Sequence, residues 1–216
     1  MKKQTKKMVL TVILIIILLS SVAVFFRHAS KNTKDQAVDH VEIARELSGN
    51  NDFAGAEREY LLVQSDNENN EVYWRELGYV YQQQMKRLEA ISSYEKSLKI
   101  NDGVATTHNL LGNLYRESNQ LEKAISSYQK ALGLSPNLIP AVVNLNNIFL
   151  LQNKTDESIS LLVKYYDGSK ARAEIGLQLA SIYKSIDKAG EARQILTKIL
   201  ESDPNNEKAQ ALIKTL

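Results

Sequence analysis

Residues 71–100 read EVYWRELGYVYQQQMKRLEAISSYEKSLKI, and residues 105–134 read ATTHNLLGNLYRESNQLEKAISSYQKALGL. When the two stretches are aligned with a shift of 34 residues, ten residues of the first recur in the second. Five of them are Leu77, Gly78, Tyr81, Ala90 and Tyr94, which become Leu111, Gly112, Tyr115, Ala124 and Tyr128. Within each stretch the spacings of three and four place these residues on single helix faces. Each stretch therefore predicts two helices that pack together.

The same period of 34 extends over five units without an insertion. It joins small residues, which are Ala56, Ala90, Ala124, Ser158 and Ala192. It also joins large ones, which are Leu47, Tyr81, Tyr115, Phe149 and Tyr183. A fixed period of this size is typical of stacked helical repeats, in which each unit buries its apolar face only against its neighbours.

The pattern Trp74-x-x-Leu77-Gly78-x-x-Tyr81, followed by Ala90-x-x-x-Tyr94, resembles the tetratricopeptide repeat (TPR). The resemblance implies an all-α fold, a right-handed solenoid of helical hairpins. We expect five units over 37–206, namely 37–70, 71–104, 105–138, 139–172 and 173–206, followed by a capping helix at 207–216. Unit 139–172 departs most, with Asn146 in place of the glycine and a second helix that we expect to end early, at Gly168.

The turn sequences agree with this division. Four polar pairs fall between the two helices of a unit, where side chains that start helices are favoured: Asn51-Asp52, Asn119-Gln120, Asn153-Lys154 and Asp187-Lys188. Pro140 falls in the first turn of a helix, where its missing N–H is not needed.

An apolar segment precedes the repeats. Residues 8–26 form an uncharged run of 19 residues, which as a helix spans roughly 28 Å, close to the thickness of a bilayer core. The basic tail 1–7 contains four lysines, and this favours a cytoplasmic N-terminus. We therefore expect a transmembrane helix at 8–26, a polar linker at 27–36, and repeats on the extracytoplasmic side, periplasmic or extracellular. The alternative is a signal peptide cleaved after Ser21-Val22-Ala23.

The charge is divided unevenly along the chain. Residues 1–34 hold seven of the 27 basic residues and no acidic one, so residues 35–216 carry about −5 despite the formal net charge of +2. This argues against nucleic acid as a partner of the repeats. The absence of cysteine excludes disulfides, thiolate metal sites and cysteine nucleophiles.

No motif predicts catalysis. The sequence contains no G-x-S-x-G, P-loop or G-x-G-x-x-G string. His40 and His108 share the column of Trp74, and we expect them half-buried between helices and structural. We therefore predict no enzyme, no cofactor, no metal site and no small-molecule substrate.

The resemblance implies a concave groove lined by the first helix of each unit, because helix positions 2, 5, 9, 12 and 13 usually face it in this family. Transferred to this chain, these positions give a candidate peptide groove of Arg45, Arg75, Tyr79, Gln82, Gln83, Asn109, Asn113, Arg116, Glu117, Val143, Asn147, Ser181 and Lys184. Asparagine amides both donate and accept, and the arginines can pair with carboxylates. The family's carboxylate-clamp pattern is not reproduced.

We therefore predict a membrane-anchored scaffold that binds a protein or an extended peptide segment in assembly, secretion or envelope maintenance. One alternative is an N-terminally anchored receptor or co-chaperone-like adaptor that faces the cytosol. Another is a soluble exported module after signal cleavage. Self-association through the irregular unit stays open.

Overall fold

The computed structural model of the protein describes residues 40–216, and these divide into two units, 40–69 and 70–216. All regular structure in this range is helical, with no strand. The prediction of an all-α solenoid is confirmed for the described residues. The predicted transmembrane helix at 8–26 and the linker at 27–36 lie outside them. From residue 40 onward, no helix combines the length and apolarity needed to cross a bilayer.

The first unit contains one helical hairpin. Residues 40–49 are helical, α2 spans Phe53–Leu62, and a 3₁₀ turn follows at Gln64–Asn67. Ala56 and Tyr60 of α2 are buried. At the start of α2, Asp52 accepts a hydrogen bond of 2.9 Å from the backbone N–H of Gly55, and this satisfies one of the free donors of the helix N-terminus.

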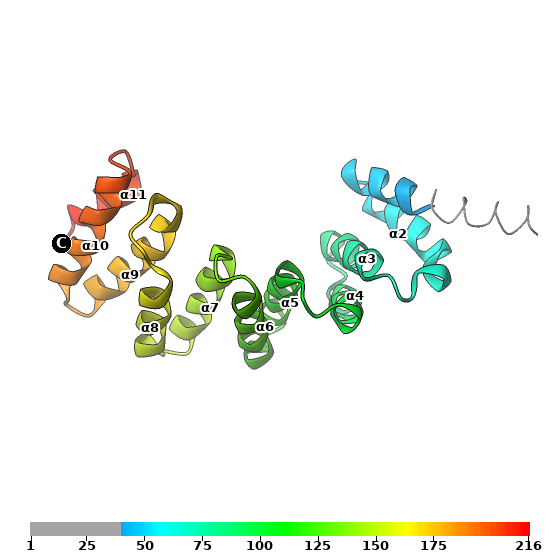
Figure 1. Cartoon of the computed structure of the whole chain (residues 1–216), viewed down its shortest axis with the longest axis horizontal. Coiled ribbons are helices and arrows are strands. Elements are labelled where there is room, and N and C mark those ends of the chain that lie inside the picture. The colour runs from blue at the N-terminus through cyan, green and yellow to red at the C-terminus, as the bar shows by residue number, and fades with distance from the viewer. Residues whose placement is uncertain (1–39) are drawn as a thin grey trace, which may run out of the picture. The chain divides into compact units, whose positions relative to one another are not determined.

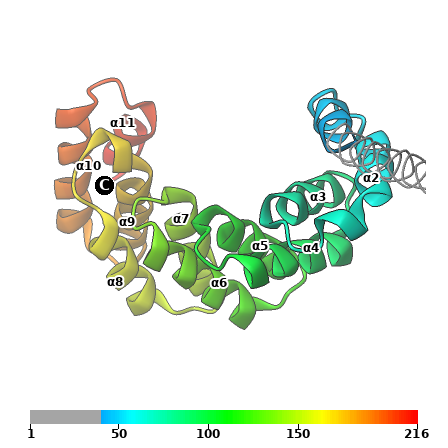
Figure 2. The same cartoon turned by 45° about the vertical axis from the view of Figure 1, so that its right-hand side comes forward.

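The second unit is a stack of helices that follow one another in chain order (Figure 1). The first helices of its hairpins are α3 (Glu71–Gln83), α5 (Ala105–Glu117), α7 (Ile139–Leu151) and α9 (Ala173–Ser185). The second helices are α4 (Arg87–Ile100), α6 (Leu121–Leu134), α8 (Thr155–Tyr165) and α10 (Ala189–Ser202). A last helix, α11 (Glu207–Ile213), packs Leu212 and Ile213 against the buried end of the stack. Figure 2 shows the same order after a turn of the view.

The turns inside the hairpins share one backbone motif. Five residues spaced by 34 have positive φ between 56° and 63°: Asn51, Met85, Asn119, Asn153 and Asp187. Each donates its N–H to the carbonyl three residues before it, and the next residue donates to the carbonyl five residues before. This is the Schellman motif, which satisfies free carbonyls at a helix C-terminus.

The prediction that these turn residues start the second helices is therefore wrong at most positions. Gln120, Lys154 and Lys188 occupy the N-caps of α6, α8 and α10 without a side-chain capping bond. Asparagine and aspartate are instead suited to the turn because they tolerate the left-handed backbone conformation better than other residues with a side chain.

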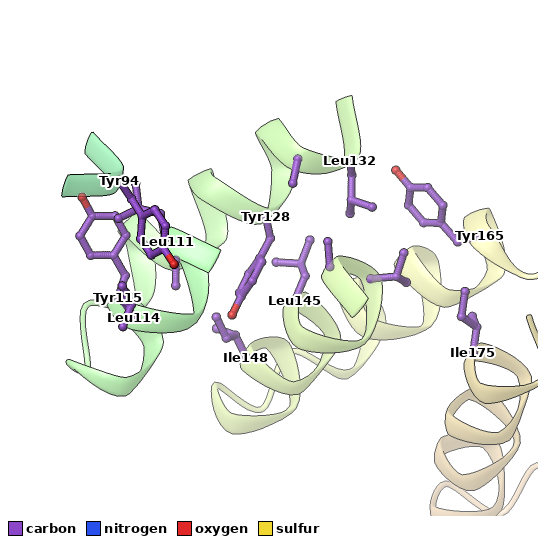
Figure 3. Close-up of a cluster of buried hydrophobic side chains, with 14 of the residues drawn as sticks. Tyr94, Leu111, Leu114, Tyr115, Tyr128, Leu132, Leu145, Ile148, Tyr165 and Ile175 are labelled. Atoms are coloured by element: carbon purple, nitrogen blue, oxygen red, sulfur yellow. The ribbon is translucent and has the colours of Figure 1, made fainter. Parts of the chain in front are cut away.

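The hairpins α3–α4 and α5–α6 close through contacts between a glycine and a tyrosine ring. A Cβ on Gly78 would lie 2.9 Å from the ring of Tyr94, and one on Gly112 would lie 2.7 Å from the ring of Tyr128. Both tyrosines are fully buried. They belong to one apolar cluster that runs from α4 to α9 (Figure 3). The glycines are thus required for the rings to lie directly on the first helices.

The irregular hairpin replaces this contact with a polar one. Asn146 stands in the glycine column and is completely buried. Its Oδ1 accepts from the hydroxyl of Ser158, and its Nδ2 donates over 2.8 Å to Oε1 of Gln178. The tyrosine column holds the smaller Leu162. Because its hydrogen bonds are made on both sides, a buried amide is tolerated here.

The second helix of this hairpin ends early. Helix α8 has 11 residues, against 14 in α4, α6 and α10, and it stops at Tyr165, three residues before the predicted end at Gly168. Gly168 has a φ of 82°. The following segment is held by Arg172, whose guanidinium donates to the carbonyl of Tyr165 and, over 2.6 Å, to Oδ1 of Asn137.

Candidate functional site

The first helices of the second unit form a continuous surface, because α5 contacts α7 and α7 contacts α9. A cavity of about 740 Å³ opens on this surface between α7, α9 and α11. We call it the C-terminal groove. Its apolar lining comes from all three helices and consists of Leu150, Leu177, Ile182, Ala211 and Leu212. Such a lining favours the burial of an apolar side chain from a bound molecule.

Polar groups stand beside this apolar lining. Two of the predicted groove residues, Asn147 and Ser181, line the cavity together with Gln178. Lys208 of α11 lies 3.6 Å from the carboxylate of Glu174. The ammonium of Lys184 donates over 2.7 Å to Oγ1 of Thr215. These contacts join α11 and the residues that follow it to α9, so the capping segment forms one wall of the groove.

Asn113 is held in a defined orientation on α5. Its Oδ1 accepts two hydrogen bonds, one of 2.7 Å from the hydroxyl of Tyr128 and one of 2.9 Å from Nδ2 of Asn144. Its Nδ2 makes no hydrogen bond with the residues described. Since the two ends of a primary amide point in different directions, the donor end of Asn113 is left for another molecule.

Burial keeps the hydroxyl of Tyr128 in its donor form. Desolvation raises the pKa of Tyr128 to about 12, while the charge of Arg116 opposes the shift. A tyrosine hydroxyl is already protonated at neutral pH, and this shift keeps the Tyr128 hydroxyl protonated at alkaline pH as well. A similar contact occurs one repeat earlier, where the hydroxyl of Tyr94 donates over 3.1 Å to Oε1 of Gln82. Burial likewise raises the pKa of Tyr94.

Two further predicted residues are engaged in ion pairs within the second unit. Nε of Arg75 lies 2.9 Å from Oε1 of Glu71 on the same helix. Glu117 lies 3.8 Å from Nε of Arg87, beside a smaller cavity of about 200 Å³ that Gln82 and Gln83 also line. These contacts reduce the charge that Arg75 and Glu117 offer to a partner.

The structure does not bring the whole predicted set together. Arg45 belongs to the first unit, where it lies 3.4 Å from Oε2 of Glu42. Tyr79 is exposed on α3, whereas Asn109 and Val143 are half-buried. Arg116 is also half-buried and makes no ion pair with any described residue. The predicted set therefore identifies the surface, and two of its members, Asn147 and Ser181, line the C-terminal groove.

Sequence reasoning missed several residues of the C-terminal groove. Leu150 stands one period after Arg116, and Leu177 stands one period after Val143, so the 34-residue column alone would have found both. Gln178 occupies a helix position that was not considered. Thr215 stands one period after Ser181, and Leu212 stands one period after Gln178. Extending the predicted column past residue 206 would therefore have found Thr215 as well.

The histidines occupy structural positions. Nδ1 of His40 lies 2.6 Å from Oε2 of Glu59 in the first unit. His108 is buried, rather than half-buried as predicted, and its Nε2 lies 3.0 Å from both the carbonyl and the carboxylate of Asp102. Among the described residues, no group of three His, Cys, Asp or Glu side chains is placed to hold a metal ion.

Comparison with known families agrees with the geometry. A model described as "Tetratricopeptide repeat" matches residues 70–137, and a second model with the same description matches 149–216. Together they cover more than half of the chain. The chain is a tetratricopeptide repeat protein. Neither model describes a catalytic domain.

Solved structures show the same fold. MamA is 21% identical to this TPR protein, with a TM-score of 0.67 over 81% of this chain and 96% of MamA. YrrB, described as "a TPR protein with an unusual peptide-binding site", is also 21% identical, with a TM-score of 0.64 over 88% of this chain and 98% of YrrB. PilF of Pseudomonas aeruginosa is 16% identical, with a TM-score of 0.62 over 83% of this chain and 82% of PilF. No curated protein matches the sequence.

Proposed function

We propose that this TPR protein is a membrane-anchored scaffold that binds a protein or peptide segment on its first-helix surface. The observation that carries the proposal is the C-terminal groove, a cavity of about 740 Å³. Its apolar lining lies beside Asn147, Gln178 and Ser181. An apolar lining with a few polar groups is typical of a site that recognises a side chain and its backbone.

The chemistry of the surface favours a polypeptide. Asn113 presents the donor end of its amide. Asn144 donates to Asn113, and its own Oδ1 accepts no hydrogen bond from the described residues. A peptide bond carries one acceptor and one donor, so it can satisfy both amides at once. YrrB, which has the same fold, is described as having a peptide-binding site, and this supports a similar use of the surface here.

The proposed location rests on the N-terminal sequence. The apolar run 8–26 would anchor the chain, and the four lysines before it favour a cytoplasmic N-terminus. The repeats would then lie on the extracytoplasmic side. There they would hold a partner close to the membrane during assembly, secretion or envelope maintenance.

A pair of matched substitutions tests the groove. Ser181→Arg places a long charged side chain inside it, whereas Thr197→Arg places the same side chain on exposed α10, away from the cavity. Tagged full-length proteins should be cross-linked in cells and their partners quantified by mass spectrometry. We expect at least one partner to be lost from Ser181→Arg and retained by Thr197→Arg. Equal recovery of every partner by both variants would refute binding in the groove.

The absence of cysteine makes the topology directly testable. Gln4→Cys and Thr197→Cys each give a single thiol, which a membrane-impermeant maleimide labels only where it is accessible. In intact spheroplasts we expect Thr197→Cys to be labelled and Gln4→Cys to react only after permeabilisation. The opposite pattern would place the repeats in the cytosol, and recovery of a mature chain that begins near Val24 would establish cleavage.

A further inference from the structure

One column of the repeat places charges and an apolar side chain in a row. Arg116 on α5, Leu150 on α7 and Lys184 on α9 follow one another at intervals of 34 residues. Leu150 is 40% exposed and lines the C-terminal groove. Because α5 contacts α7 and α7 contacts α9, the three residues occupy equivalent places on consecutive, adjacent helices.

The two cations of this row form no ion pair with a carboxylate of residues 40–216. Arg116 makes no ion pair within residues 40–216, and the only bond found for the ammonium of Lys184 is to the neutral hydroxyl of Thr215. The other charged residues considered on this surface are paired with opposite charges: Arg75 with Glu71, Glu117 with Arg87, and Glu174 with Lys208. The row therefore presents two separate positive charges with the apolar side chain of Leu150 between them, and Leu150 lines the C-terminal groove, which extends from α7 past α9 to α11.

The helix spacing sets the length of a ligand that reaches both cations. Axes of packed helices lie about 8–10 Å apart, so two steps from α5 to α9 amount to roughly 16–20 Å. An extended chain rises about 3.3 Å per residue, and this distance corresponds to about five or six residues. Side chains of an extended chain alternate between two faces, so residues i and i+6 point the same way.

We propose that this surface selects an extended peptide segment that carries acidic side chains at i and i+6 and apolar side chains on the same face between them. The acidic groups pair with Arg116 and Lys184, and the apolar groups enter the C-terminal groove at Leu150. The proposal rests on the proposed function, since it assigns a sequence pattern to the partner of the same surface.

Two synthetic peptides of identical composition test this pattern. The first is Glu-Ser-Leu-Ser-Leu-Ser-Glu, and the second is Leu-Ser-Glu-Ser-Glu-Ser-Leu, with acidic and apolar positions exchanged. Both carry an N-terminal fluorescein on a Gly-Gly spacer and a C-terminal amide, so that no terminal carboxylate contributes. Binding to the full-length protein in detergent is measured by fluorescence anisotropy. We expect the first peptide to bind at least five-fold more tightly, with an affinity that falls as salt rises.

Single substitutions then test the assigned contacts. Arg116→Gln and Lys184→Gln should each lower the affinity for the first peptide by about three-fold, which is the contribution typical of a partly exposed ion pair. Leu150→Ser should remove most of the preference for the first peptide over the second. Lys198→Gln is the matched control, because it removes a charge from the exposed side of α10; it should leave both affinities unchanged.

Three results would overturn the proposal: no binding of the first peptide at millimolar concentration, equal affinity for both peptides, or equal effects of Lys184→Gln and Lys198→Gln. The proposed function fails separately. It falls if Ser181→Arg and Thr197→Arg recover the same partners, and it stands if Ser181→Arg loses a partner while neither peptide binds.

Discussion

The hydroxyl of Tyr128 donates a hydrogen bond of 2.7 Å to Oδ1 of Asn113, while its ring covers Gly112. One side chain thus closes the hairpin α5–α6 and sets the direction of an amide on the binding surface. The repeat needs the ring for packing, and the surface uses the hydroxyl. The core of this unit and its candidate site are therefore coupled through a single residue.

The first prediction concerns alkaline pH. The folded-state pKa of Tyr128 is raised to about 12, above the value of about 10 for an exposed tyrosine, so the folded state holds this proton more tightly. The contribution of the protonated Tyr128 hydroxyl to the stability of the folded state is complete below pH 10, and it is lost as the pH rises from 10 towards 12. The urea midpoint, followed by circular dichroism, should fall between pH 8 and pH 11.

Tyr128→Phe separates the contribution of the Tyr128 hydroxyl from those of the other groups that titrate at alkaline pH, such as Tyr94. The variant keeps the ring but loses the hydroxyl, so it should be less stable at pH 8 by about 1 kcal/mol. Its urea midpoint should then fall less between pH 8 and pH 11 than that of the wild type. An equal fall in both proteins would show that the Tyr128 hydroxyl does not contribute.

The second prediction tests the contact between glycine and tyrosine. Gly112→Ala places a methyl group 2.7 Å from the ring of Tyr128, and overpacking of this kind costs about 1–3 kcal/mol. Gly133→Ala on α6 is the control, because nothing lies within 4 Å of its Cβ. It should stabilise the helix by up to about 1 kcal/mol. Thermal unfolding of both variants measures the two shifts, which should have opposite signs.

The third prediction concerns the exposed Met85. It has a φ of 60° in a turn whose four equivalent positions hold asparagine or aspartate, and it is 85% exposed. The left-handed conformation costs a residue such as methionine about 1 kcal/mol more than asparagine. Met85→Asn should therefore raise the melting temperature, and Asn119→Met should lower it. A decrease with Met85→Asn would indicate that its side chain makes a stabilising contact.

The fourth prediction concerns the irregular hairpin. Asn146→Gly removes two hydrogen bonds and leaves a cavity, and Leu162→Tyr brings a ring towards the Asn146 side chain. Each change alone should destabilise by about 2 kcal/mol or more. Together the two changes recreate the glycine–tyrosine pair seen at Gly112 and Tyr128. The free energy of unfolding of the double variant should therefore exceed the value expected from the sum of the two single losses by at least about 1 kcal/mol. Strict additivity in urea unfolding would show that the two columns do not exchange as a pair.

The sequence predicted the fold because the packing contacts recur in it. The two columns that contain Gly112 and Tyr128 identify the hairpins, and the same period locates Asn146 as an exception. The sequence did not reveal that Asn119 takes the left-handed backbone conformation in its turn, since asparagine is common both at helix starts and in left-handed turns. The hydrogen bonds that satisfy Asn146 also need the structure, because Gln178 comes from a different hairpin.

The binding surface was only partly predictable for a related reason. Periodic positions identify which residues of a first helix face outward, and they located Asn147 and Ser181. They do not show that Arg75 is paired with Glu71 while Arg116 is unpaired, because this depends on side-chain geometry. They also reach Thr215, one period after Ser181, but they do not show that Leu212 of α11 completes the apolar lining.

The central claim is that a partner binds on the first-helix surface at the C-terminal groove. It is tested most directly by placing the photo-cross-linker p-benzoylphenylalanine at Leu150 or Ser181 in the full-length protein, with Gln194 and Thr197 on α10 as control positions. After irradiation of cells, we expect a partner of one defined mass to be cross-linked from Leu150 and Ser181 but not from the two controls. Cross-linking of that partner from α10 alone, or equally from all four positions, would contradict the claim.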